Sequence, residues 1–353
     1  MSFGWHASFG DNCLMDRRTF LSAVSGAAMA QNANPAAVKF SIDLFSIRTS
    51  GWTPFQYLDY CAKWKATVVH FSEVRFIGSL EEGNLKQVRA HADKLGIQLE
   101  LGMRSICPTS KAFDPKAGTA EEQLTRMIHS AQVAGSPIVR CFLGTMADRV
   151  GPIPIEGHIQ NTSKVLRNIK SRAVDAGVKI AIENHAGDMQ GRELKMLIEE
   201  AGKDFVGACI DSGNPLWTIE DPHVTLDQLH PYVLTSHIRD TAVWRVAEGA
   251  AVRWTRMGEG NVDIDGYIRK YRQLCPGKAL SLEIIVTAPR TFAYLDPGFW
   301  EGYRNVPAWQ FSRFVAIAEK GKPSPAPSKP EDQAARERED LEESIRYTQR
   351  LLA

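Results

Sequence analysis

The sequence lacks an excess of charge of either sign, a long apolar run and any close pair of cysteines. Lys and Arg number 42 and Asp and Glu number 41 among 353 residues, which argues against a nucleic-acid partner. No run of about 18 apolar residues occurs, so no ordinary transmembrane helix and no stable membrane span is predicted. The six cysteines are scattered without a C-x-x-C pair, which argues against a zinc ribbon or a redox dithiol. With 44% hydrophobic residues, the composition is instead that of a folded protein with a sizeable core.

Paired arginines stand near the start of the chain. Residues 16–21 read D-R-R-T-F-L, and a short, weakly apolar stretch follows that ends in the small-x-small sequence of residues 28–30. This succession resembles a twin-arginine export signal, so we expect residues 1–30 to be a signal region recognised by the twin-arginine export machinery. The resemblance implies a periplasmic or secreted protein that is exported folded. A chance Arg-Arg before a buried strand is the alternative, and residues 1–14, upstream of Met15, also fit a start codon assigned too early.

The other end of the chain has a different composition. Residues 323–330 are rich in proline, and a charged stretch follows them. We therefore expect residues 321–353 to be a linker and a solvated, charged tail that lies outside the fold and is helical in part.

Between these ends, short apolar runs rich in β-branched residues alternate eight times with helical patterns. Gly96, Gly135 and Gly177 each follow a helical pattern, as glycines at helix C-termini do. The runs are apolar throughout, which is typical of parallel strands covered on their faces. No G-x-G-x-x-G follows the first run, which argues against a dinucleotide-binding fold. The sequence thus predicts an α/β protein, a single-domain (β/α)₈ TIM barrel over residues 38–320, with strands at 39–45, 67–72, 98–102, 138–142, 179–183, 206–211, 233–238 and 279–285.

Four successive predicted strands end in a potential metal ligand. Glu183 ends the fifth strand, Asp211 the sixth and His237 the seventh, and Glu283 lies near the end of the eighth. The carboxyl ends of barrel strands meet at one rim, and charged groups in apolar strands are costly unless they are paired or bind a metal. Three carboxylates and one imidazole suit a divalent cation, with Mn²⁺ favoured and Mg²⁺, Co²⁺ or Zn²⁺ as alternatives. Salt-bridged carboxylates in the barrel are the plainer interpretation of any one of these residues.

The motifs at these strand ends are E-N-H, D-S-G-N and H-I-R-D, and G-E-G-N-V-D follows at residues 258–263. Together they resemble the xylose isomerase-like barrel superfamily of sugar isomerases and epimerases, over about residues 38–320. The resemblance implies a divalent-metal-dependent sugar isomerase or epimerase that transfers a proton through a metal-stabilised enediolate of a small-molecule carbohydrate. It implies catalytic roles for Glu183 and Glu283 in addition to ligation. Glu259, in the glycine-rich loop, is interpreted as structural.

Three positions depart from the pattern of the ketose 3-epimerases. Met189, Asn214 and Val243 stand where that pattern has Glu, His and Arg, so the substrate stays open. His185, two residues beyond Glu183, adds a candidate catalytic base. This Glu-x-His arrangement is similar to that of superfamily members that cleave oxidised glycosides. We therefore keep a metal-dependent eliminase or lyase acting on 3-keto-glycosides as the alternative function, with a supporting hydrogen bond as the plainer role of His185.

Further residues of the predicted rim are candidates for substrate binding. Each charged candidate could equally form a rim salt bridge, and each tryptophan could simply pack in a loop. Trp52, Trp244 and Trp254 fall in predicted loops of the catalytic face. A non-catalytic carbohydrate-binding protein is the second alternative, and homo-oligomerisation is left open. The substrate-binding candidates are Glu73, Arg104, Arg140, Asn214, Arg239 and Trp217.

Overall fold

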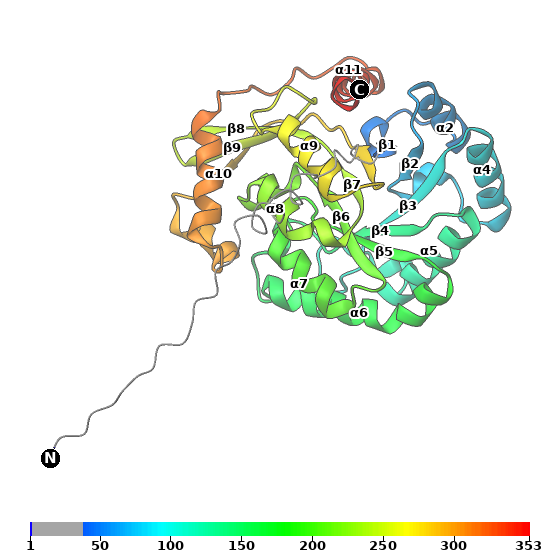
Figure 1. The fold of residues 1–353 in the computed structure, drawn as a ribbon, viewed down its shortest axis with the longest axis horizontal. Coiled ribbons are helices and arrows are strands. Elements are labelled where there is room, and N and C mark those ends of the chain that lie inside the picture. The colour runs from blue at the N-terminus through cyan, green and yellow to red at the C-terminus, as the bar shows by residue number, and fades with distance from the viewer. Residues whose placement is uncertain (2–37) are drawn as a thin grey trace. The chain divides into compact units, whose positions relative to one another are not determined.

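The computed structural model describes Met1 and residues 38–353, and its main body is an eight-stranded parallel barrel (Figure 1). The strand order is β10-β1-β2-β3-β4-β5-β6-β7, and a parallel bridge between Ile238 and Leu282 joins its two ends. The expected export signal lies outside the described residues and stays a prediction. The strands are β1 (Lys39–Asp43), β2 (Val68–Phe71), β3 (Gln98–Ser105), β4 (Ile138–Phe142), β5 (Lys179–Glu183), β6 (Val206–Asp211), β7 (Val233–His237) and β10 (Ala279–Leu282).

These strands confirm the predicted (β/α)₈ fold. Three of them, β4, β5 and β6, have the predicted bounds, and the other five overlap the predicted ranges. Strands β2, β4 and β6 are buried at every position, as expected for parallel strands with both faces covered.

Amphipathic helices surround the barrel and bury one face each. Helix α5 shows how the sequence sets their ends: Thr119 and Glu122 form a capping box at its start, and Gly135 adopts the left-handed conformation at its end. Among the described residues, no helix is long and apolar enough to cross a membrane. The helices are α2 (Pro54–Lys63), α3 (Val74–Ile77), α4 (Glu82–Lys94), α5 (Ala120–Ala134), α6 (Ile155–Asp175), α7 (Gly191–Ala201), α8 (Pro222–Leu229), α9 (Ile264–Leu274), α10 (Ala308–Lys320) and α11 (Gln333–Leu352).

A second sheet, which the sequence analysis did not predict, follows β7. Strands β8 (Asp240–Val246), β9 (Gly249–Thr255) and β11 (Arg290–Phe292) pair in the antiparallel order β11-β9-β8. Helix α10 contacts β8 and β9. Phe292 of β11 and Phe314 of α10 belong to a hydrophobic cluster that is separate from the main core. The sheet places Trp244 and Trp254 on strands, which corrects the expectation that they lie in loops.

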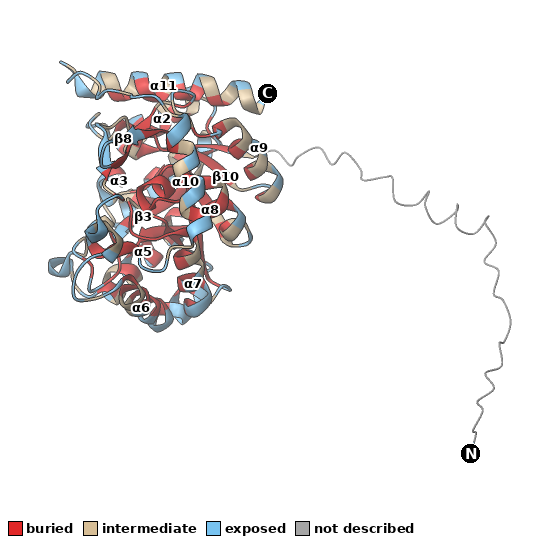
Figure 2. Cartoon of the chain, turned by 90° about the vertical axis from the view of Figure 1, so that its left-hand side faces the viewer, coloured by how far each residue is buried: buried red, intermediate tan, exposed pale blue. Residues whose placement is uncertain are grey.

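The C-terminal segment also differs from the expectation of a solvated tail. Helix α11 contacts β10 and the short helix η1 (Leu44–Ile47), and buried residues follow its length in Figure 2. Leu341 and Ile345 are fully buried in the main core. Glu337 accepts hydrogen bonds from the backbone N–H and the side-chain hydroxyl of Thr49 at 2.9 and 2.8 Å. Residues 333–352 are thus part of the helical layer around the barrel. The helix is rich in charged residues, but it is amphipathic and buries its apolar stripe.

Shortening a buried side chain of α11 should destabilise the whole barrel. We expect Leu341→Ala to lower the free energy of unfolding by about 2–5 kcal/mol, because it leaves a cavity in the main core. Leu352→Ala, the same substitution at a partly buried position of this helix, should cost no more than about 1 kcal/mol. Urea unfolding followed by circular dichroism measures both, and equal small losses would show that α11 is dispensable.

The buried carboxylate of Glu220 connects helices α7 and α8. Glu220 is fully buried and its Oε2 accepts hydrogen bonds from the backbone N–H of Gly191 at 2.8 Å and from Thr225 Oγ1 at 2.7 Å. Burial raises the pKa of Glu220 to about 7, since the charged form loses its hydration.

The raised pKa of Glu220 predicts a loss of stability as the pH rises. Between the usual pKa of 4.5 and about 7, the folded chain holds a proton that the unfolded chain has released. This contribution, roughly 3 kcal/mol, should therefore be present at pH 4 and lost by pH 8. Urea unfolding of wild type and Glu220→Gln across this range tests it, because the variant should not show this part of the decline. Parallel pH profiles of the two proteins would contradict the assignment.

Candidate metal centre and active site

Four ionisable side chains converge at the rim formed by the carboxyl ends of β5, β6, β7 and β10. Glu183, Asp211 and His237 are the last residues of their strands, and Glu283 directly follows β10. One potential ligand atom from each lies within 4.8 Å of the others, and all four residues are buried. The structure therefore brings together the residues predicted as ligands, because parallel strands of a closed barrel end at the same rim.

His237 lies at the centre of this group. Its Nδ1 is 3.1 Å from Glu183 Oε2 and 3.2 Å from Glu283 Oε2. His237 Nδ1 is buried and makes no hydrogen bond among the described residues. Buried polar atoms are rarely left unpaired, so this nitrogen has the environment expected of a ligand to an ion.

Two arginines neutralise part of the negative charge. Arg140 Nε donates to Glu183 Oε2 at 2.6 Å, and Nη2 of the same guanidinium contacts that oxygen. Arg239 Nη2 lies 2.5 Å from Asp211 Oδ2 and also contacts Glu283. Burial by itself would raise the pKa of Glu183, but Arg140 and His237 outweigh burial and hold this pKa well below its usual range. Three carboxylates against two guanidiniums leave one negative charge in excess when His237 is neutral.

These residues fit a divalent cation. Three oxygens and one nitrogen suit Mn²⁺, Mg²⁺ or Co²⁺, and the unpaired Nδ1 of His237 lies 3.2 Å from Glu283 Oε2. An ion at this position would replace the contact that Arg239 makes with Asp211 and Glu283. Cys209 also lies near Glu183 and His237, but burial raises the pKa of its thiol to about 11, so the thiol stays protonated.

A cavity of about 240 Å³ lies beside this cluster. Two of the predicted catalytic residues, Glu283 and His185, line the cavity, whereas Glu183 lies beneath its surface. Trp217 is the predicted substrate-binding residue that does not line it; its ring stacks at 4.3 Å on that of Trp254, which does. The predicted substrate-binding residues that line the cavity are Glu73, Arg104, Arg140, Asn214 and Arg239, and Phe45, Ser72, Phe142 and Ile285 also do.

Contacts hold His185 in a defined orientation. Its ring stacks on Phe142 with the centroids 3.8 Å apart, and its backbone N–H donates to Asp188 Oδ1 at 2.8 Å. Nδ1 lies 2.8 Å from the carbonyl oxygen of Gly144, which can only accept, so Nδ1 carries the proton and Nε2 the lone pair. Burial lowers the pKa of His185 to about 4, which keeps the ring neutral near pH 7.

The glycine-rich loop at residues 258–263 has a structural function. The backbone N–H groups of Gly258 and Gly260 donate to Asp240 Oδ2 at 3.0 and 2.9 Å, and a Cβ at Gly260 would lie 2.2 Å from the other carboxylate oxygen of Asp240. Glu259 is exposed and does not line the cavity, in line with the structural interpretation.

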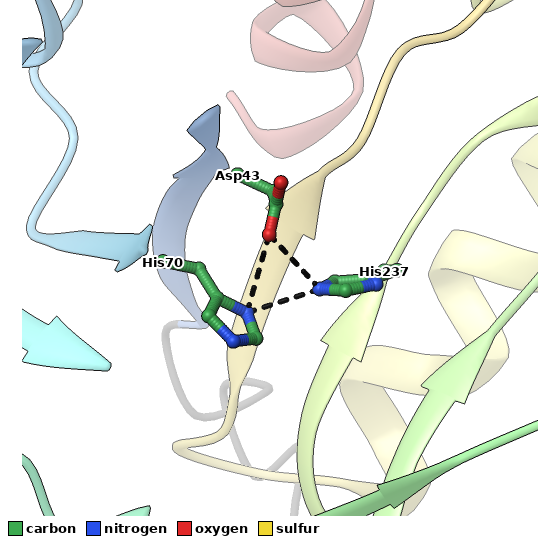
Figure 3. A group of neighbouring side chains, drawn as sticks. All are labelled: Asp43, His70 and His237. Carbon is green, nitrogen blue, oxygen red and sulfur yellow. Dashed lines mark hydrogen bonds and ion pairs between the residues drawn. The ribbon is translucent and has the colours of Figure 1, made fainter. Parts of the chain in front are cut away.

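Sequence reasoning missed two buried residues next to His237. Asp43 ends β1 and His70 lies in β2, and both side chains point toward His237 (Figure 3). His237 Nε2 is 3.1 Å from Asp43 Oδ2 and 3.0 Å from His70 Nδ1. An ionisable residue inside a mostly apolar strand or at its carboxyl end was the available signal, the same one that identified Glu183.

A comparison of the sequence with family models gives the class of protein. The model described as xylose isomerase-like TIM barrel matches residues 58–296, and the chain belongs to this family.

Individual relatives are distant. A 3-oxo-isoapionate decarboxylase from Pectobacterium atrosepticum is 24% identical over 210 residues, which cover 59% of this chain and 69% of the relative. The structure of a D-psicose 3-epimerase in the presence of D-fructose has a TM-score of 0.60 at 14% identity and covers 89% of this chain and 99% of that one. A 3-keto-D-glucoside 4-epimerase from E. coli has a TM-score of 0.54 at 13% identity, with coverage of 79% and 98%. The two structural likenesses show a shared fold.

Metal analysis tests the candidate centre directly. We expect the purified chain to bind one divalent ion, and Asp211→Asn to lose most of it, because the rim then has one charged ligand fewer. Inductively coupled plasma mass spectrometry after dialysis against Mn²⁺ measures the ratio of ion to protein. Glu220→Gln, which also converts a buried carboxylate to an amide but lies outside the rim cluster, is the matched control and should keep the ion. An ion content near zero in the wild type would contradict the assignment.

Proposed function

We propose that the protein is a divalent-metal-dependent sugar isomerase or epimerase that moves a proton on the carbon next to a carbonyl group. The observation that carries the proposal is the convergence of Glu183, Asp211, His237 and Glu283 beside a polar cavity. The names of the similar proteins support a keto-sugar as substrate, since they refer to 3-oxo-isoapionate, D-psicose with D-fructose and a 3-keto-D-glucoside.

The structure supports different tasks for the two glutamates. A divalent cation at the rim would polarise the substrate carbonyl and stabilise the enediolate that proton loss creates. Both oxygens of Glu183 already accept hydrogen bonds, from Arg140 and from Asn214 Nδ2, so Glu183 is suited to holding the ion and not to carrying a proton. Glu283 lines the cavity, which Glu183 does not, and its carboxylate contacts Arg239; because it can reach a substrate in the cavity, we assign it the proton transfer to and from the substrate. This division narrows the expectation that both glutamates exchange protons.

Arg104 can orient the substrate. It lines the cavity and is exposed, and among the described residues no carboxylate pairs with it. Glu73, on the same wall, is held by Arg75 through Oε2. The guanidinium of Arg104 is therefore free to donate to hydroxyl or carbonyl oxygens of a sugar.

A second function, β-elimination from a 3-keto-glycoside, is favoured by the position of His185. The ring lines the cavity with Nδ1 bonded to Gly144, so its Nε2 lone pair is the available base. A base of this kind would remove the acidic hydrogen next to the keto group, and the glycosidic oxygen would leave with the electron pair of the broken bond. The two functions share the proton abstraction and differ in the product.

Solvent exchange and product analysis test both functions. In D₂O, isomerisation or epimerisation by the Mn²⁺-loaded protein should place deuterium next to the carbonyl of the sugar, because the carbon that loses a proton is reprotonated from solvent. Elimination from a 3-keto-glycoside should instead release the aglycone and leave that carbon in a double bond, without deuterium. Glu283→Gln should lower isomerisation or epimerisation by about 10²- to 10⁴-fold. Glu259→Gln, the same substitution at an exposed position, should leave the rate unchanged.

His185→Gln separates the two reactions. It should abolish release of the aglycone from a 3-keto-glycoside if elimination is the reaction, and should spare formation of an epimer or isomer. Absence of deuterium, epimer and aglycone with every keto-sugar tested would contradict the proposed enzyme and favour a carbohydrate-binding protein.

A further inference from the structure

A buried carboxylate at the end of β1 faces the imidazole of the candidate metal centre. Asp43 is fully buried, and its Oδ2 lies 3.1 Å from His237 Nε2 (Figure 3). We propose that Asp43 is a positioning residue that holds His237 with its proton on Nε2 and its lone pair on Nδ1. The inference deepens the proposed function, since it assumes that the rim binds a divalent ion.

Asp43 is itself fixed by two neighbours. Its Oδ1 accepts from the backbone N–H of Phe45 at 2.6 Å and from Ser72 Oγ at 2.8 Å. These bonds use one oxygen and set the plane of the carboxylate, which leaves Oδ2 for the imidazoles. Oδ2 makes no hydrogen bond of standard geometry among the described residues, and lies 3.1 Å from His237 Nε2 and 3.5 Å from His70 Nδ1. The side chain is therefore oriented before any ion binds.

The orientation of His237 follows from the chemistry of the two groups. An ionised carboxylate cannot donate and repels a lone pair, so Asp43 Oδ2 at 3.1 Å favours the tautomer of His237 with its proton on Nε2. That N–H can then donate to His70 Nδ1, which lies 3.0 Å away. Nδ1, on the opposite side of the ring, then offers its lone pair toward Glu183 and Glu283, at 3.1 and 3.2 Å. A carboxylate behind a ligand histidine fixes the ring and raises the basicity of the ligating nitrogen.

His70 is the second buried residue next to His237 Nε2, with its Nδ1 at 3.0 Å. It is fully buried, its ring lies at 48° to that of His237, and its Nδ1 is 3.5 Å from Asp43 Oδ2. Glu100 lies one contact further away, with Oε2 4.0 Å from His70 Nδ1 and 2.6 Å from Thr235 Oγ1. Glu100 is thus a buried carboxylate of the barrel interior that does not pair with His237, which makes it the matched control for Asp43.

The experiment compares Asp43→Asn with Glu100→Gln in the full chain. After removal of metal with a chelator, the affinity for Mn²⁺ is measured by isothermal titration calorimetry. Asp43→Asn should raise the Kd by about 10- to 100-fold, because an amide can donate to Nε2 and let the proton occupy Nδ1. Glu100→Gln should stay within about twofold of the wild type, since its side chain does not contact His237. Ser72→Ala, which frees Asp43 Oδ1, should give a smaller loss in the same direction and serves if Asp43→Asn does not fold.

A spectroscopic readout separates positioning from a general effect on stability. In ¹⁵N-labelled, Zn²⁺-loaded protein, NMR should show the proton of His237 on Nε2, protected from exchange. Equal Kd values for wild type, Asp43→Asn and Ser72→Ala would overturn the role of Asp43 but leave the proposed function standing. Two ions per wild-type chain, one of them lost in His70→Asn, would also overturn it, because Asp43 and His70 would then be ligands themselves. No Mn²⁺ or Zn²⁺ binding by the wild type would overturn the proposed function and this inference together.

Discussion

The burial of three carboxylates at one end of the barrel is the constraint on which the rest of the site depends. Glu183, Asp211 and Glu283 are almost completely shielded from water, and such a group is stable only when cations and hydrogen bonds compensate for the lost hydration. Arg140 and Arg239 supply part of this compensation, and His237 lies between the carboxylates. The negative charge that remains when His237 is neutral and the unpaired Nδ1 of His237 suit the rim to a cation.

The surrounding elements support this charge arrangement in different ways. The guanidinium of Arg239 lies 4.4 Å from the ring of Trp254, so the hairpin of β8 and β9 helps to hold a charged side chain of the rim. Asp240, which begins β8, fixes the glycine-rich loop through backbone N–H groups. Strands β1 and β2, which follow β10 in the barrel, supply Asp43 and His70 next to His237. The added hairpin and these two strands thus serve the rim as much as the four strands that carry the predicted ligands.

The sequence was sufficient for what depends on local pattern. Unbroken apolar runs located all eight barrel strands, and one charged residue at the end of each of four runs located the rim cluster. The hairpin of β8 and β9 escaped prediction because residues 240–255 interrupt the regular alternation of strand and helix. Helix α11 was taken for a solvated tail because its charge hides a narrow apolar stripe, whose burial requires a partner surface almost 300 residues away in the chain, as the Thr49–Glu337 contact shows. Asp43 and His70 become meaningful only when the closed barrel brings β1, β2 and β7 around one imidazole.

The central claim is that a divalent ion occupies the space among the four rim ligands. A crystal structure of the Mn²⁺-loaded protein, with anomalous data collected at the manganese edge, tests this claim most directly. The account predicts one strong anomalous peak within ligand distance, about 2.0–2.3 Å, of Glu183, Asp211, Glu283 and Nδ1 of His237, with Arg239 displaced from the two carboxylates. A map without a peak at the rim, in which Arg239 still bridges Asp211 and Glu283, would contradict it.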